Sequence, residues 1–205
     1  MTASPAPSAP SSGQETFWNL PNSVTMLRVA VVPVLLALPL ALDERGSAII
    51  AVCFIVAAVT DVIDGWLARR GQQVTSIGKL LDPLADKLLV STALIVLLAV
   101  GRIPVWATWM VVVIVGRELA VTGLRSVAAA GGQVMAASGL AKIKTVSQNI
   151  AIGALLFHYT TLGLPADTIG MLFLAIATAL TLWSGYVYFA EYFRGREATG
   201  GREGG

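Results

Sequence analysis

Six long apolar runs divide this chain, and they limit the folds that it can adopt. Of its 205 residues, 56% are hydrophobic and 13% are charged, whereas soluble domains carry about 25% charged residues. The runs cover about residues 24–42, 47–61, 80–100, 104–130, 137–159 and 169–189. A helix rises about 1.5 Å per residue, and a bilayer core is about 30 Å thick. We therefore predict an all-α, polytopic integral membrane protein with six transmembrane helices.

The polar ends of the chain lie outside these runs. Residues 1–16 are rich in Ser, Pro and Ala, which predicts a disordered N-terminal tail, and they do not resemble a secretory signal. Residues 193–205 are rich in glycine, which predicts a flexible C-terminal tail. We expect a single transmembrane domain over residues 17–192, with its chemistry at the membrane face.

Four of the six aspartates fall between residues 60 and 87, beside two apolar runs. Asp61 and Asp64 are three residues apart, and Asp82 and Asp86 are four apart, so each pair shares one face of a helix. Carboxylates at membrane depth are costly and are usually functional. Together the two faces would offer an oxygen-rich pocket for divalent cations such as Mg²⁺. The alternative is a solvated helix end whose acids pair with neighbouring Arg and Lys residues.

The stretch that contains these aspartates reads D-x2-D-G-x2-A-R-x8-G-x3-D-x3-D, with eight specified residues. It resembles the signature of the CDP-alcohol phosphatidyltransferase family, and every fixed position of that signature is filled. The resemblance implies that Asp61, Asp64 and Asp82 bind two metal ions, Mg²⁺ or Mn²⁺. It implies that Asp86 contributes to the metal site and acts as the general base. The expected CDP-binding positions are Gly65, Ala68, Arg69 and Gly78.

Three further segments resemble the bacterial branch of the family whose product is phosphatidylglycerophosphate. They are NLPNSVTMLR at residues 19–28, GRELAVTGLR at 116–125 and SGLAKIKTVSQ at 138–148. The resemblance implies transfer of a phosphatidyl group from CDP-diacylglycerol to sn-glycerol 3-phosphate, with release of CMP. It places Thr25 and Arg28 at the edge of a cytoplasm-facing polar cavity. It also implies a homodimer among membrane lipids.

A group of cations follows the aspartates along the chain. Arg117 and Arg125 are eight residues apart, a little over two helical turns, so they point in roughly the same direction. Lys142 and Lys144 come at the start of the next apolar run. Cations close to metal-bound carboxylates suit a ligand that carries phosphate, and we expect these four residues to bind the acceptor phosphate. The alternative is that they extend to lipid headgroups.

The basic residues also predict an orientation. Twelve of the fourteen Lys and Arg residues fall on the side of the aspartates, and only Arg45 and Arg102 fall on the other side. The positive-inside rule then places the aspartates and both termini in the cytoplasm, at a bacterial plasma membrane. The net charge of +2 and the absence of a basic run with aromatics argue against nucleic acid. One cysteine and one histidine argue against disulfide and histidine–zinc chemistry.

Other functions compete with this one. Members of the same family use inositol phosphate, serine or phosphatidylglycerol as the acceptor, and the cation group alone does not exclude a phosphorylated alternative. A cation-coupled transporter would also place acids at membrane depth. Against it, the two halves of the chain show no internal repeat. A helical scaffold without activity would leave the spacing of the aspartates unexplained.

Overall fold

The computed structural model describes residues 20–68, 76–130, 139–160, 163 and 165–200, with side chains placed for 25–60, 84–129, 142–160, 163 and 165–192. Within these residues the secondary structure is entirely helical, which confirms the all-α prediction. The α-helices are α1 Leu20–Leu36, α2 Glu44–Ala68, α3 Ser76–Ala99, α4 Thr108–Ala130, α5 Gly139–Phe157 and α6 Ala166–Gly200. Two short 3₁₀ helices, η1 Leu38–Leu40 and η2 Val105–Ala107, lie in the connections.

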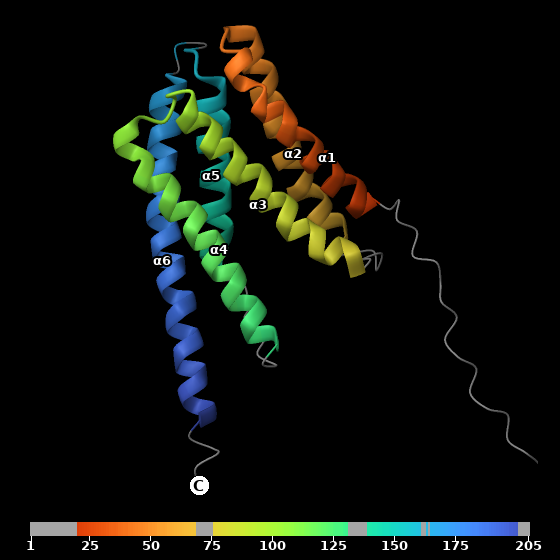
Figure 1. Ribbon diagram of the computed structural model, residues 1–205, viewed down its shortest axis with the longest axis vertical. Coiled ribbons are helices and arrows are strands. Elements are labelled where there is room, and N and C mark those ends of the chain that lie inside the picture. The colour runs from red at the N-terminus through yellow and green to blue at the C-terminus, as the bar shows by residue number, and fades with distance from the viewer. Residues whose placement is uncertain (1–19, 69–75, 131–138, 161–162, 164, 201–205) are drawn as a thin grey trace, which may run out of the picture.

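The helices run up and down between two ends of the molecule (Figure 1). The connections from α1 to α2, from α3 to α4 and from α5 to α6 lie at one end, which we call the loop end. The start of α1, the end of α2, the start of α3 and the end of α6 lie towards the other, which we call the aspartate end. The described chain ends therefore share a side with the helix ends that carry the aspartates, as we expected.

The first apolar run is interrupted, which corrects the expected helix over residues 24–42. The α-helix ends at Leu36, and the 3₁₀ helix Leu38–Leu40 follows it. Pro39 explains the change, because proline lacks an N–H group and its ring clashes with the carbonyl four residues earlier in an α-helix. Leu38 is nevertheless fully buried, so the 3₁₀ turn still packs against the core.

The last helix is longer than the predicted run over residues 169–189. It extends from Ala166 to Gly200, a length of 35 residues. Residues 193–200, which we assigned to a flexible tail, are therefore helical in the structure. The polar residues of this extension include Arg and Glu, which are good helix formers, so the helix can continue after the apolar pattern stops.

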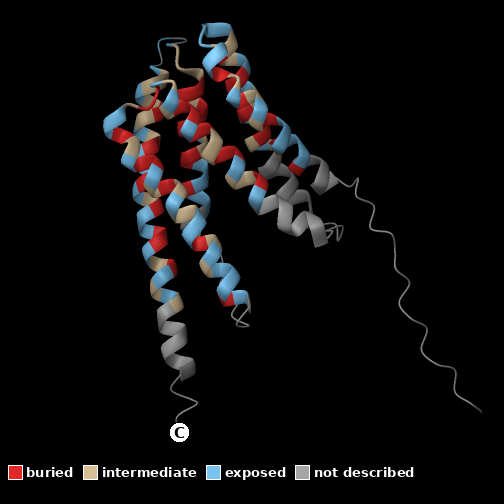
Figure 2. Ribbon diagram, in the orientation of Figure 1, coloured by how far each residue is buried: buried red, intermediate tan, exposed pale blue. Residues whose placement is uncertain are grey.

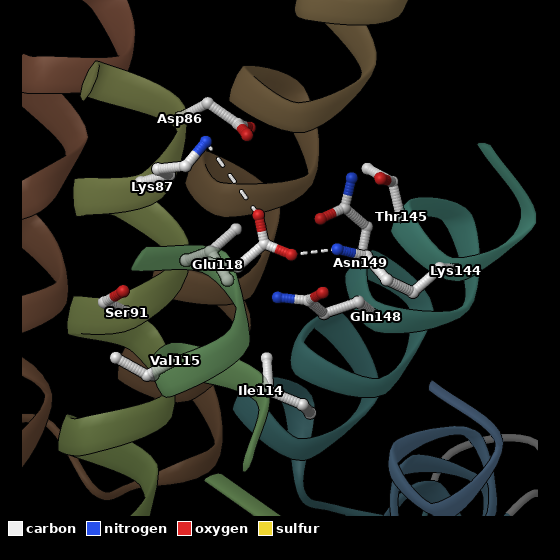
Figure 3. Close-up of a pocket in the computed structure, with 11 residues that line it drawn as sticks. Asp86, Lys87, Ser91, Ile114, Val115, Glu118, Lys144, Thr145, Gln148 and Asn149 are labelled. Carbon is white, nitrogen blue, oxygen red and sulfur yellow. Dashed lines mark hydrogen bonds and ion pairs between the residues drawn. The ribbon is translucent and has the colours of Figure 1, made fainter. Parts of the chain in front are cut away.

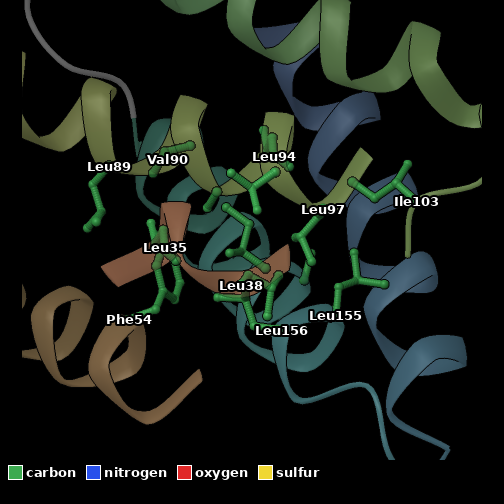
Figure 4. Close-up of a cluster of buried hydrophobic side chains, with 14 of the residues drawn as sticks. Leu35, Leu38, Phe54, Leu89, Val90, Leu94, Leu97, Ile103, Leu155 and Leu156 are labelled. Atoms are coloured by element: carbon green, nitrogen blue, oxygen red, sulfur yellow. The ribbon is translucent and has the colours of Figure 1, made fainter. Parts of the chain in front are cut away.

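One hydrophobic core joins the helices near the loop end. Its fully buried side chains include Leu35 of α1, Phe54 of α2, Leu94 of α3 and Leu155 of α5, which Figure 4 shows together. In Figure 2 the buried residues lie where helices face each other, and exposed residues cover the outer faces. The core holds the upper parts of the helices in fixed positions relative to one another.

Large apolar side chains also cover the outside of the bundle. Ile49 on α2, Val112 on α4 and Leu172 on α6 are each about 60% exposed. Such a surface suits lipid and is unusual in a soluble monomer. Among the described residues, Val105–Ala129 and Ala166–Tyr192 are long and apolar enough to span a bilayer. The structure thus supports a membrane protein, and the predicted set of six spans stays a prediction.

A buried arginine closes the loop end. Arg102 lies between α3 and α4, and its guanidinium donates hydrogen bonds to the carbonyls of Leu155 and Leu156 in the last turn of α5. It also donates to the hydroxyl of Ser47 in α2. The last carbonyls of a helix lack partners within the helix, and a cation there also complements the helix dipole. Arg102 therefore joins three separate parts of the chain.

We predict that Arg102→Met destabilises the fold, because the Ser47 hydroxyl and two buried carbonyls lose their donor. The free energy of unfolding should fall by about 2 kcal/mol or more. Thermal unfolding of the purified protein in detergent would measure the change. Arg45→Met, at an exposed position of the same end, is the matched control and should unfold as the wild type does. Equal melting temperatures for both variants would contradict this role of Arg102.

Candidate active site

The helical backbone supports the expected pairing of the aspartates. Asp61 and Asp64 lie in α2, and Asp82 and Asp86 lie in α3, so each pair shares a helix face. The side chains of Asp61, Asp64 and Asp82 lie outside the described part of the structure. Among the side chains that are described, no three His, Cys or acidic groups gather as a metal site. The predicted metal centre is therefore represented here by Asp86 alone.

The positions expected to contact CDP fall in the same region. Gly65 and Ala68 belong to the last turns of α2, and Gly78 belongs to the first turn of α3. Arg69 lies outside the described residues. Gly65, Ala68 and Gly78 thus lie close in sequence to residues 69–75, which connect the two aspartate-bearing helices, and the role of all four positions in binding CDP stays a prediction.

Asp86 lines a small polar pocket between α3, α4 and α5 (Figure 3). Lys87, Val90 and Ser91 also line it from α3, Glu118 comes from α4, and Lys144 comes from α5. The cavity volume is about 20 Å³, which is room for about one water molecule. A cavity of this size is too small for a substrate, so substrate binding would require these side chains to move apart.

Glu118 stands at the centre of the charges in this pocket. Its Oε1 accepts hydrogen bonds from the Lys144 ammonium and from Nη1 of Arg117, the latter at 3.3 Å. Its Oε2 lies 3.9 Å from Nζ of Lys87. Figure 3 shows Glu118 reaching towards Lys87. The Glu118 carboxylate thus forms ion pairs with three cations, one each from α3, α4 and α5.

These charged groups are largely removed from solvent. The exposed fraction is 5% for the Lys144 side chain, 11% for Arg117 and 18% for Glu118. Buried charges are tolerated when they are paired and hydrogen-bonded, and losing one partner leaves the others uncompensated. The cluster is therefore stabilised by its ion pairs, because separating any one of them would leave a buried charge without a partner.

The two arginines of α4 turn towards α6. Arg117 Nη2 donates to Ser184 Oγ at 3.0 Å. The guanidinium carbons of Arg117 and Arg125 lie 5.4 and 5.7 Å from the centre of the Tyr188 ring. These are cation–π distances. The prediction that Arg117 and Arg125 point in the same direction is confirmed.

The structure divides the expected phosphate-binding group. Lys144 lines the pocket beside Asp86, whereas Arg117 and Arg125 meet at Tyr188, and Glu118 connects the two parts. Lys142 is exposed at the start of α5 and does not line the pocket.

The positions expected at the cavity edge belong to α1. Thr25 and Arg28 are buried, with 2% and 5% of their surface exposed, and they are one turn apart. Neither lines the pocket that contains Asp86. Arg28 is a buried charge at the midpoint of α1. Their place at the edge of a larger cavity stays a prediction.

A second, apolar hollow lies beside the first. It is a groove of about 500 Å³ between α2 and α5, within the range of about 300–1,000 Å³ for ligand pockets. Phe54 and Ala58 line it from α2, and Ile150 and Gly153 line it from α5. Asn149 lines both the groove and the polar pocket. An apolar space thus lies directly next to a charged one.

Several residues of the site were missed by the sequence analysis. Tyr188, Ser184, Gln148 and Asn149 were not selected, because each is ordinary on its own in a membrane helix. A signal was present in α5, where Lys144 and Gln148 are four residues apart and share a face within an apolar run. The contact of α6 with Arg117 depends on which helices are neighbours, and spacing along the chain does not give that.

Comparisons with known proteins identify relatives of this chain. The model of the family described as CDP-alcohol phosphatidyltransferase matches residues 18–183. A relative from Bacillus subtilis (strain 168), named CDP-diacylglycerol–glycerol-3-phosphate 3-phosphatidyltransferase, is 44% identical over an alignment of 187 residues. The match covers 85% of this chain and 95% of the relative. Proteins of the same name from Rickettsia typhi and Pseudomonas fluorescens are 38% and 39% identical. They cover 83% and 81% of this chain, and the matches span 95% and 86% of those relatives.

Proposed function

The chain belongs to the CDP-alcohol phosphatidyltransferase family, and we propose that it transfers a phosphatidyl group from CDP-diacylglycerol to sn-glycerol 3-phosphate. The products are phosphatidylglycerophosphate and CMP, so the protein is an enzyme of phospholipid synthesis. The names of its relatives support this acceptor over inositol phosphate, serine or phosphatidylglycerol.

One observation about the structure carries the proposal. Asp86, the residue expected to act as the base, lines the same pocket as Lys87 and Lys144. An acceptor that carries both a hydroxyl and a phosphate needs such a site, in which a carboxylate can take a proton while cations hold the phosphate. A transporter or scaffold would not require this combination.

The reaction follows from these positions. The acceptor hydroxyl loses its proton to the Asp86 carboxylate as its oxygen attacks the β-phosphorus of CDP-diacylglycerol. A new P–O bond forms to the acceptor, and the bond between the β-phosphorus and the oxygen bridging to CMP breaks. CMP leaves with that oxygen. Holding donor and acceptor together makes the step effectively unimolecular.

The acidic residues fit a hard divalent cation, because all four expected ligands are carboxylates and α2 and α3 each place two of them on one face. Asp61, Asp64, Asp82 and Asp86 would hold two Mg²⁺ or Mn²⁺ ions. Such ions neutralise diphosphate oxygens and stabilise the leaving group. The chain's own part would be to carry these carboxylates near the end of α2 and the start of α3.

The donor needs both a nucleotide site and a place for its acyl chains. Gly65, Ala68, Arg69 and Gly78 would surround the CDP group, since small residues allow close approach to the backbone. The groove between α2 and α5 suits an acyl chain, because its lining is apolar and Asn149 connects it to the polar pocket. The reacting diphosphate would then lie where apolar and charged surfaces meet.

The acceptor phosphate would be bound by the basic residues of α4 and α5. Lys144 lines the pocket, and Arg117 donates a hydrogen bond to Glu118, which also lines the pocket. Arg125 and Lys142 lie further towards the aspartate end, where they would attract the anion from solvent. Thr25 and Arg28 would border this cavity.

The protein is a membrane protein, and the active site would face the cytoplasm of a bacterium. The excess of Lys and Arg at the aspartate end supports this orientation. The resemblance to the family also suggests a homodimer. Its transmembrane domain would cover residues 17–192 and interact with membrane lipids and not with nucleic acid.

We predict that Asp86→Asn lowers kcat for CMP release by about a hundredfold or more, because a general base contributes about 10²–10⁴. The assay uses CDP-diacylglycerol, glycerol 3-phosphate and Mg²⁺ with the purified enzyme. Asp43→Asn, at the loop end, is the control and should keep wild-type turnover. Near-normal turnover of Asp86→Asn would remove the base assignment.

We also predict that Ala58→Phe raises KM for CDP-diacylglycerol by about tenfold, because the ring fills the groove between α2 and α5. KM for glycerol 3-phosphate should stay within about twofold of the wild-type value. With a donor that has short acyl chains, the variant and the wild type should have similar KM values for the donor. Ala175→Phe, on the exposed surface of α6, is the matched control. Equal changes in both KM values, or none in either, would argue against an acyl chain in this groove.

A further inference from the structure

The charged groups that surround Glu118 carry more positive than negative charge. Arg117, Lys87 and Lys144 contribute three positive charges, and Glu118 and the neighbouring Asp86 contribute two negative charges, which leaves +1. A phosphate monoester carries about −1.5 to −2 near pH 7. The cluster therefore carries an excess of positive charge, which favours the binding of an anion such as a phosphate monoester.

Glu118 fixes where the two lysines lie. Its Oε1 binds Lys144 of α5, and its Oε2 lies 3.9 Å from Lys87 of α3, so the carboxylate bridges ammonium groups from two helices. Each ammonium has three N–H donors, and Glu118 engages at most one of them. The other donors can bind a second anion without breaking the bridge.

Without this carboxylate the cations would separate. Three positive charges near one another in a largely buried site repel strongly, because the local dielectric is low. Lysine has a flexible stem with four carbons, so an unbridged ammonium can turn away towards solvent. The carboxylate opposes this by attracting both ammonium groups to a single point.

We propose that Glu118 is a positioning residue for the acceptor phosphate, which holds Lys87 and Lys144 together beside Asp86. This inference rests on the proposed function, and it adds Glu118 and Lys87 to the residues of the acceptor site. Glu118 itself does not touch the reacting atoms. It acts through the two lysines, whose remaining donors bind the phosphate while Asp86 receives the hydroxyl proton.

The test is the Glu118→Gln variant, assayed for CMP release with each substrate varied in turn. KM for glycerol 3-phosphate should rise by about tenfold, while KM for CDP-diacylglycerol stays within about twofold. The inhibition constant of inorganic phosphate, used as a competitive inhibitor of glycerol 3-phosphate, should rise by a similar factor. Glu44→Gln, at the loop end, is the matched control and should leave all three values unchanged.

A double mutant shows whether Glu118 acts through Lys144. If it does, Glu118→Gln combined with Lys144→Gln should raise KM for glycerol 3-phosphate little more than Lys144→Gln alone. A rise in KM for the double variant equal to the product of the two single-variant rises would contradict the inference. A general loss of structure would instead change both KM values and the melting temperature, so the thermal unfolding of each variant is measured alongside.

Two results would overturn the inference directly. An unchanged KM for glycerol 3-phosphate would show that Glu118 does not position its ligands, and a lowered KM would show that it competes with the phosphate. Glu118→Asp keeps the charge, shortens the reach and should raise this KM by about threefold, so it carries the test if the Gln variant does not fold. Failure of the proposed function is separate, because the wild type would then release no CMP with glycerol 3-phosphate.

Discussion

The ion pair between Glu118 and Lys144 is the interaction on which the polar part of this molecule depends. It joins α4 to α5 inside an otherwise apolar bundle, where an unpaired charge would cost several kcal/mol. Arg117 and Lys87 gather around the same carboxylate, and Arg117 continues to Ser184 on α6. Four helices are thus joined at one level by these ion pairs and hydrogen bonds, and Asp86 lies at the edge of that level.

The two ends of the bundle are stabilised differently. The contacts at the loop end stabilise the fold, whereas the candidate active site lies towards the aspartate end. At the loop end, Arg102 binds carbonyls of α5 and the hydroxyl of Ser47, above the hydrophobic core. Towards the aspartate end the charged pocket and the apolar groove meet at Asn149. A lipid-linked diphosphate has the same division into apolar and charged parts, so this arrangement suits the donor of the proposed reaction.

Much of this could be read from the sequence, because its strongest signals are local. The spacing of Asp82 and Asp86 and that of Arg117 and Arg125 need only the helical period, and both pairs lie on helices as expected. The end of α1 was misplaced, since Pro39 lies in an apolar run and breaks the α-helix without exposing Leu38. The contacts of Arg117 with Ser184 and Tyr188 could not be predicted, because they depend on α6 packing against α4.

The central claim is that this protein makes phosphatidylglycerophosphate at the site that contains Asp86. Its most direct test is to supply the purified wild-type protein with CDP-diacylglycerol, Mg²⁺ and labelled glycerol 3-phosphate in lipid nanodiscs, and to measure CMP and labelled lipid together. The account predicts equal amounts of both products, and no CMP when the acceptor is omitted. Absence of labelled lipid, or CMP release that does not depend on glycerol 3-phosphate, would contradict it.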